Sequence, residues 1–193
     1  KTGKYEIVEL ANAHNSEAEL LENLPWKAIG TLPTDHQILK KIQKDQTRLR
    51  NAGYGHERID QIIKEEKPDI YLGIEDIWAF SGFTKKPWWD KISSIVHTTL
   101  DSLPLLPEAI EAAPAIKNYF VWAGFAEKEM KKLGFDHVKT VHGIVEHDHF
   151  FKVKDEARQQ LRKSAKVTDD FVIGFVFRNQ LRKSVHNLLD GFK

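Results

Sequence analysis

The residues best suited to chemistry are two cations, Arg178 and Lys183, which follow an apolar run near the end of the chain. That run, Phe171–Phe177, is typical of a parallel strand that is buried on both faces. Residues 188–192 then show the apolar spacing of a helix face. A strand that leads through cations into a helix N-terminus favours phosphate, because backbone N–H groups, the helix dipole and the guanidinium fork all attract anions. The alternative is that both cations belong to a solvated loop.

Segments with strand and helix patterns alternate along the chain, which predicts an α/β fold with a Rossmann-like parallel sheet and helices on both faces. The predicted strands are Tyr5–Leu10, Trp26–Gly30, Asp69–Ile74, Ser94–Thr98, Asn118–Trp122 and Val138–His142. The predicted helices are Asp35–Arg50, His56–Lys64, Ala126–Leu133 and Asp155–Ala165. In such folds ligands bind at the carboxyl ends of the strands, so the residues just after each strand are site candidates.

Three side chains follow the Asp69–Ile74 strand at this predicted edge: Glu75, Asp76 and Trp78. A carboxylate there is suited to binding sugar hydroxyls, and an aromatic face stacks on a sugar ring. Asp76 equally fits the cap of a short helix. Tryptophan is also common in protein cores, and the same two interpretations apply to Trp88–Trp89.

His97 and Asp101 follow the next predicted strand and are the candidates for acid–base catalysis. An imidazole and a carboxylate close to an acceptor hydroxyl are able to exchange its proton. Their spacing does not fix their mutual geometry. The alternative, which we favour, is that His97 caps the end of a strand and Asp101 begins a turn.

A stretch at 142–149 is rich in imidazole and carboxylate groups, which bind zinc. Its candidate ligands are His142, Glu146, His147, Asp148 and His149. They match no recognised ligand spacing, and a turn between two domains explains their polarity. We therefore expect no metal site and no cofactor.

The amino-acid composition argues against some classes of function, namely nucleic-acid binding and integral membrane contact. The chain has 193 residues, 41% of them hydrophobic and 30% charged, which is normal for a globular protein. The chain has 29 Lys and Arg residues and 28 Asp and Glu residues, so its net charge is close to zero. The net charge therefore gives no indication of nucleic-acid binding. No stretch approaches the roughly 18 apolar residues of a membrane span, and we expect no integral membrane contact. The absence of cysteine is compatible with a reducing compartment, and we expect a cytoplasmic protein.

The cationic segment carries a family resemblance. Arg178, four intervening residues, Lys183 and then L-L-D-G-F at 188–192 resemble the opening of the donor-binding domain in GT-B glycosyltransferases of the glycosyltransferase group 1 (family 4-like) type. In that family the Arg and the Lys hold the diphosphate of a nucleotide sugar, so the resemblance implies this role for Arg178 and Lys183. The family often has Gly just before the Arg and just after the Lys, where this chain has Phe177 and Ser184.

The rest of the chain resembles the N-terminal domain of the same family. K-P-D-I at 67–70 and V-H-G-I-V-E at 141–146 carry this similarity, together with Phe150. The resemblance implies an acceptor-side Rossmann-like domain at 1–150 that lacks its first strand. It also implies a linker helix and the first strand–loop–helix of an incomplete donor domain at 151–193. The chain therefore resembles an enzyme truncated at both ends.

The resemblance implies a retaining, metal-independent glycosyltransferase whose donor is a nucleotide-diphosphate sugar and whose acceptor is unknown. The rim at Glu75, Asp76 and Trp78 would face the acceptor, and the fragment alone is expected to be inactive. The second hypothesis is a non-catalytic α/β module that binds an anion or a protein. An unpaired apolar strand exposes backbone groups that pair readily with another chain. We therefore also predict a homodimer through Phe171–Phe177.

Overall fold

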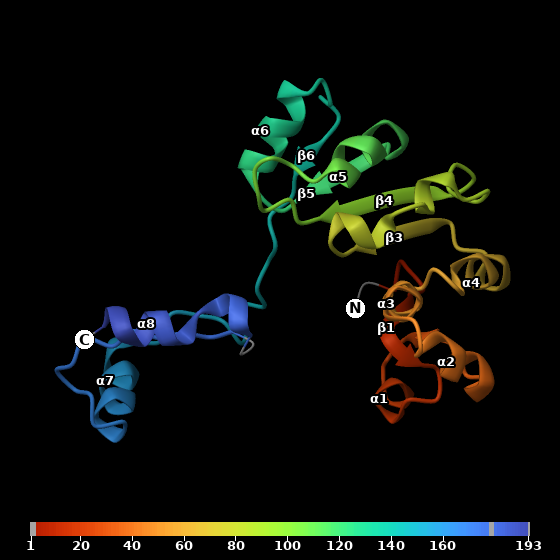
Figure 1. Cartoon of the computed structure of the whole chain (residues 1–193). Coiled ribbons are helices and arrows are strands. Elements are labelled where there is room, and N and C mark those ends of the chain that lie inside the picture. Colours follow the sequence, from red (N-terminus) through yellow and green to blue (C-terminus); the bar gives the residue numbers. More distant parts are fainter. Residues whose placement is uncertain (1–2, 178–179, 193) are drawn as a thin grey trace. The chain divides into compact units, whose positions relative to one another are not determined.

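Figure 1 shows the computed structural model of the chain, in which residues 3–177 and 180–192 are described. The chain divides into two compact units, Lys1–Gly143 and Ile144–Lys193. The division falls a little before residue 150, the predicted end of the first domain.

The first unit contains two parallel sheets. β1 (Val8–Asn15) and β2 (Lys27–Leu32) pair with each other. The second sheet has the order β3-β4-β5-β6. Its strands are β3 (Ile70–Ile74), β4 (Ser93–Thr98), β5 (Asn118–Val121) and β6 (Lys139–Thr140). Every strand predicted for this part of the chain overlaps an observed one.

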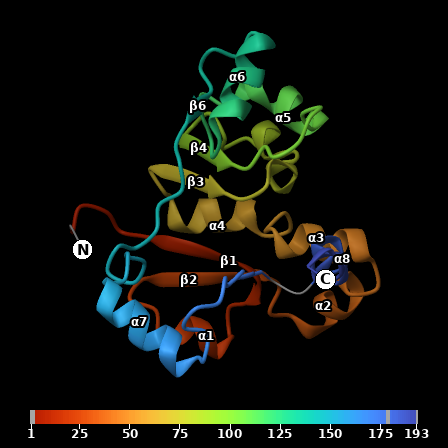
Figure 2. The same ribbon diagram turned by 90° about the vertical axis from the view of Figure 1, so that its left-hand side faces the viewer.

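Helices lie on both sides of these sheets (Figures 1 and 2). The α-helices of the unit are α1 (Glu19–Glu22), α2 (His36–Ile42), α3 (Gln46–Gly53), α4 (Ile59–Glu66), α5 (Pro107–Ala112) and α6 (Gly124–Lys132). Short 3-10 helices are η1 (Ile77–Phe80), η2 (Phe83–Lys85) and η3 (Ala113–Ala115). The predicted α/β class with parallel sheets is confirmed, and the arrangement is compatible with a Rossmann-like fold.

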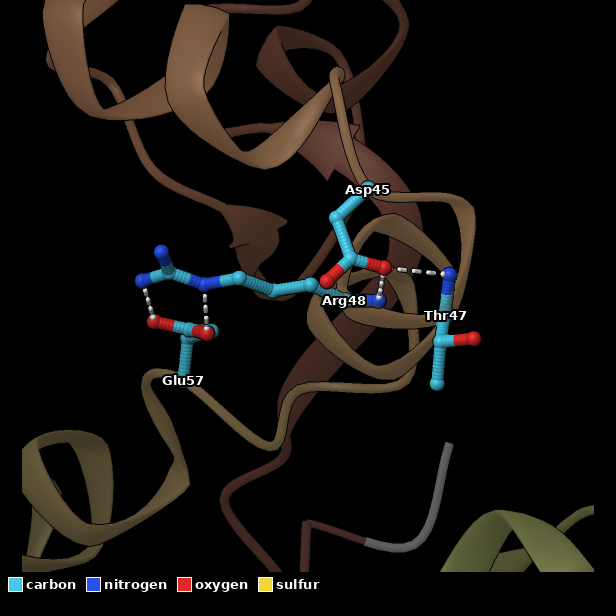
Figure 3. A network of polar contacts seen from close by, with 4 residues as sticks. All are labelled: Asp45, Thr47, Arg48 and Glu57. Atoms are coloured by element: carbon cyan, nitrogen blue, oxygen red, sulfur yellow. Dashed lines mark hydrogen bonds and ion pairs between the residues drawn. The ribbon is translucent and has the colours of Figure 1, made fainter.

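The single helix predicted over Asp35–Arg50 is wrong, because a second N-cap interrupts it. The Asp45 carboxylate accepts hydrogen bonds from the backbone N–H groups of Thr47 (2.9 Å) and Arg48 (3.1 Å), which starts α3 anew (Figure 3). The guanidinium of Arg48 then donates to both carboxylate oxygens of Glu57, at 2.8 and 3.0 Å. This bidentate pair ties the start of α3 to the loop before α4 and lowers the pKa of Glu57.

The core of the first unit lies on one face of the β3–β6 sheet. Val96, Tyr119 and Val121 point to this face and are fully buried. Helices α5 and α6, together with buried aromatic side chains, contribute to the same apolar cluster. Trp88 and Trp89 belong to it as well, so the core interpretation holds for this pair. The indole N–H groups donate to Asp60 and to the carbonyl of Ala115, both at 2.8 Å.

The second unit contains α7 (Asp155–Ser164), a 3-10 helix η4 (Leu181–Lys183) and α8 (Val185–Gly191). The strand predicted at Phe171–Phe177 is wrong: this segment has no strand, and its apolar side chains are largely exposed, Phe171 at 87%. A doubly buried strand needs strands on both sides, and the described residues of this unit form none. The homodimer through this segment stays a prediction.

A buried threonine joins three elements of the first unit. The Thr31 hydroxyl in β2 accepts from the backbone N–H of Ala13 in β1 at 3.0 Å. It lies 2.7 Å from the carbonyl of Gly53 at the end of α3, to which it donates. The Thr31 side chain is only 1% exposed and Gly53 is buried, so the Gly53 carbonyl has no water as a substitute partner.

We predict that Thr31→Val lowers the free energy of unfolding by about 1–3 kcal/mol, because the change leaves the buried Gly53 carbonyl unpaired and removes the bond to the Ala13 N–H without changing the side-chain shape. Thr47→Val is the matched control on an exposed helix surface and should shift stability by less than about 0.5 kcal/mol. Urea denaturation measures both. Equal stability of the two variants would contradict the assigned role of Thr31.

A carboxylate fixes β6 to α6. Glu127 accepts from the Lys131 ammonium at 2.6 Å and from the backbone N–H of Thr140 at 2.7 Å. These bonds, the one from Lys131 first, lower the pKa of Glu127 to about 2. A carboxyl with a lowered folded-state pKa stabilises the protein above its ordinary pKa, and this contribution disappears as the pH falls through the folded-state value.

We therefore predict that Glu127→Gln is less stable than the unaltered chain at pH 7, and that the difference closes as the pH falls from about 4.5 toward about 2. Denaturation curves measured at several pH values test this. Glu129→Gln removes only the surface pair with Lys132 and should have a smaller effect. A pH-independent difference for Glu127→Gln would show that its carboxylate charge does not carry the interaction.

Candidate functional site

The parallel register brings the carboxyl ends of three strands to one edge of the sheet. Ile74 of β3 is in register with His97 of β4, which is in register with Phe120 of β5. Glu75 therefore leaves β3 beside the end of β4. We call the residues that follow β3, β4 and β5 at this edge the rim. It is where ligands bind in open α/β sheets.

Glu75 and Asp76 begin the rim and have different surroundings. One oxygen of Glu75 accepts from the Asn12 side-chain amide at 3.2 Å, and the other accepts from the backbone N–H of Asp76 at 3.0 Å. Asp76 precedes η1, but its carboxylate forms no capping hydrogen bond to that helix. Asp76 therefore does not cap η1 through its side chain. Its carboxylate remains available to a ligand at the rim.

Trp78 lies in a cavity of about 460 Å³ beside the rim. The guanidinium of Arg50 sits 5.5 Å from the centre of the indole ring, and the ring of Tyr54 meets the indole edge-on with a centroid distance of 4.9 Å. The cavity lining comes from α3 and the turn after it, from η1 and the residue after it, and from the start of α5. It comprises Arg50, Asn51, Tyr54, His56, Trp78, Ala79, Ser81, Leu106 and Glu108.

The charges around this cavity affect Tyr54. Burial raises the pKa of the Tyr54 hydroxyl above its ordinary value, and the negative charges of Glu75 and Asp76 raise it further. The hydroxyl therefore stays protonated near neutral pH and is a hydrogen-bond donor. Arg50 forms no ion pair with any carboxylate in the described part of the chain, so its charge is available to an acidic or polar ligand.

His97 and Asp101 are not paired. The His97 ring stacks on Trp122 with a centroid distance of 4.6 Å and an interplanar angle of 8°, and its Nε2 lies 2.7 Å from the Val141 carbonyl. Asp101 is exposed, and no hydrogen bond or ion pair joins it to His97 among the described residues. The imidazole of His97 thus contacts a backbone carbonyl and an indole ring rather than Asp101, and the choice between the two roles stays a prediction.

The histidine-rich stretch at 142–149 is divided between the two units. His142 Nδ1 lies 3.0 Å from the Trp122 carbonyl in the first unit. His149 Nδ1 lies 2.9 Å from a carboxylate oxygen of Glu146 in the second. Within residues 3–177 and 180–192, no three His, Asp or Glu side chains are grouped as metal ligands.

Of the two predicted diphosphate ligands, Arg178 lies outside the described residues. Lys183 ends η4, is half-buried and has no carboxylate partner in the part of the second unit that is described. Ser184 follows with φ 49° and ψ 47°, the left-handed region that favours glycine. This is the position at which the resembled family often has Gly.

The other residues of the cavity, above all Arg50, Tyr54 and Glu108, were not predicted from the sequence. They come from separate elements, and only the fold places them around Trp78. One local signal was present, because Tyr54 stands between Gly53 and Gly55. Gly55 has φ +87°, so the chain turns sharply there, after Tyr54.

The rim yields a prediction at Gly143, where an added Cβ would overlap the Trp122 ring. We expect Gly143→Ala to displace Trp122 from its stack on His97 and to cost about 1–3 kcal/mol of stability. The His97 ring resonances, followed by NMR, should shift because the stacked indole moves. Gly124→Ala is the matched control, since a Cβ there meets nothing within 4 Å. Unshifted His97 resonances in Gly143→Ala would contradict the stack.

Comparison of the chain with known protein families, with curated proteins and with solved structures found no match. No helix in the described ranges is both long and apolar enough to cross a membrane.

Proposed function

We propose that the chain belongs to a GT-B glycosyltransferase that moves a sugar from a nucleotide-diphosphate donor to an acceptor hydroxyl. The observation that supports this most is the rim of a parallel sheet, where Glu75, Asp76 and Trp78 adjoin a polar and aromatic cavity. In the proposed reaction the acceptor oxygen bonds to the anomeric carbon and loses its proton to an oxygen of the leaving diphosphate. The anomeric carbon–oxygen bond breaks, and its electron pair leaves with the diphosphate.

Arg178 and Lys183 have the proposed role of stabilising the charge that grows on the leaving diphosphate. Two features of Lys183 support this: the ammonium group has no described carboxylate partner, and the next residue has the backbone conformation favoured by glycine. A cation already paired with a carboxylate would have to break that pair before it could bind phosphate. Lys183 does not carry this cost.

The cavity around Trp78 is the proposed acceptor side. Its volume of about 460 Å³ falls within the range of small-molecule sites. Tyr54 offers a hydroxyl donor, Arg50 offers a cation and Glu108 offers an acceptor oxygen. Hydrogen-bonding groups of both kinds beside an aromatic ring match a hydroxyl-rich ligand that has an apolar ring face.

A second candidate function, a non-catalytic binding module, is favoured by two observations. The structure does not pair His97 with Asp101, and Phe171–Phe177 exposes a run of apolar side chains that suits a protein partner. The two functions differ in their ligand. A transferase binds nucleoside diphosphates through Arg178 and Lys183, whereas a protein-binding module has no need of them.

We predict that Lys183→Ala weakens binding of nucleoside diphosphates about tenfold or more, because one charge-assisted hydrogen bond contributes about 1.5–3 kcal/mol. Arg178→Ala should act in the same direction. Isothermal titration with uridine, guanosine and adenosine diphosphate measures the affinities, since the base is unspecified. Lys163→Ala, in the last turn of α7, is the matched control and should leave affinity unchanged. Equal affinity in the Lys183 and Lys163 variants, or no binding by the unaltered chain, would contradict the proposal.

A further inference from the structure

The cavity beside Trp78 contains a cation and a carboxylate that do not pair with each other. Arg50 lies in the last turn of α3 and Glu108 in the first turn of α5, and both line the cavity. They are its charged lining residues when His56 is neutral. Among the described residues, neither side chain forms an ion pair or a hydrogen bond. The cavity therefore offers an unpaired charge of each sign.

The indole of Trp78 holds the guanidinium of Arg50 without using its hydrogen-bond donors. The guanidinium carbon lies 5.5 Å from the centre of the indole ring, and this contact involves the ring face rather than the N–H groups. A guanidinium has five N–H donors in a planar fork that matches both oxygens of a carboxylate. Arg50 is therefore positioned to bind a ligand carboxylate through two parallel hydrogen bonds.

Charges of both signs act on Tyr54, which also lines the cavity. Burial raises the pKa of its hydroxyl most, the negative charges of Glu75 and Asp76 raise it further, and the positive charge of Arg50 lowers it. A ligand ammonium at this place is thus attracted by Glu75 and Asp76 as well as by Glu108. A ligand that carried only a carboxylate would be repelled by these three groups.

The uncharged polar groups of the lining suit a ligand with hydroxyls. Asn51 and Ser81 line the cavity, and their side chains form no hydrogen bond within the described residues. The Nε2–H of His56 donates to the Ala79 carbonyl at 2.9 Å, which fixes the imidazole at the cavity wall. Together with the Tyr54 hydroxyl, these groups offer donors and acceptors to a ligand of monosaccharide size.

We propose that the ligand of this cavity is a zwitterionic sugar, in which a carboxylate pairs with Arg50 and an ammonium pairs with Glu108. A neutral sugar would remove water from both protein charges without replacing it. A sugar with a single charge would satisfy one of them and be repelled by the other. We take the acceptor role of the cavity from the proposed function, on which this inference rests, and add the chemical class of the acceptor.

The alternative is that Arg50 and Glu108 are solvated surface charges with no ligand. Arg50 is exposed and Glu108 is half-buried, so water reaches both side chains. Surface charges of this kind would give a zwitterion no advantage over a neutral sugar. A comparison of sugars that differ mainly in charge separates the two interpretations.

The test uses four sugars that share the glucosamine ring. Muramic acid has an ammonium and a carboxylate, glucosamine has the ammonium alone, N-acetylmuramic acid has the carboxylate alone, and N-acetylglucosamine is neutral. Each sugar is titrated into the chain at about pH 6, where amino groups are protonated and carboxyl groups are ionised. The indole N–H resonance of Trp78, followed by NMR, reports occupancy of the cavity and gives the dissociation constant.

We expect muramic acid to bind roughly three- to tenfold more tightly than either singly charged sugar, because exposed ion pairs are weak and partly shielded ones are stronger. Arg50→Gln should abolish its advantage over glucosamine and keep its advantage over N-acetylmuramic acid. Glu108→Gln should do the reverse. Lys41→Gln in α2 and Glu111→Gln in α5 change exposed charges outside the cavity lining. These matched controls should leave all affinities unchanged.

Equal affinity for the four sugars, or no binding of muramic acid, would overturn the inferred ligand class. Loss of the same advantage in both cavity variants would also overturn it, because each protein charge would then lack its own ligand group.

Titration of the same chain with uridine, guanosine and adenosine diphosphate separates this ligand class from the proposed function. Charge discrimination among the sugars without an NMR response at Lys183 and Ser184 would contradict the transferase and leave the ligand class standing. A response at Lys183 and Ser184 together with equal affinity for the four sugars would overturn the ligand class and leave the transferase standing.

Discussion

The parallel pairing of β3, β4 and β5, with one face fully buried, is the constraint on which the rest of the first unit depends. The register fixes which residues leave the sheet together, and burial of Val96, Tyr119 and Val121 fixes which face the helices cover. A register slip by one residue would exchange the buried and exposed faces, so the apolar core specifies the register strongly. The rim follows directly from this arrangement, and the cavity beside Trp78 adjoins it.

Local patterns predicted a strand at each place where the first unit has one, but they missed two short helices, α1 and α5. They failed where a single side chain decides the outcome: the carboxylate of Asp45 splits one predicted helix into α2 and α3. They failed again at Phe171–Phe177. This segment has the apolar pattern of a strand, but no strand among the described residues pairs with it. A strand is stabilised by its neighbours, which a local pattern does not contain.

The candidate site was predictable only in part, for the same reason. Rim residues such as Glu75 directly follow a strand, so their place at the strand ends was readable from the sequence. Arg50 and Tyr54 reach Trp78 from α3 and the turn after it, and their closeness depends on how α3 packs. The stack of His97 on Trp122 likewise joins β4 to the end of β5. Such contacts between distant positions depend on the tertiary fold and have no local signature.

We propose that this chain binds a nucleotide-diphosphate sugar, and a map of the backbone amides that respond to such a sugar is a direct test. Backbone NMR shifts would be recorded on the chain with UDP-glucose, GDP-mannose and ADP-glucose in turn. We expect saturable shifts centred on Lys183 and Ser184 with at least one of the three sugars, and competition by the matching nucleoside diphosphate. Saturable shifts that leave Lys183 and Ser184 unmoved, or no shifts with any donor, would contradict it.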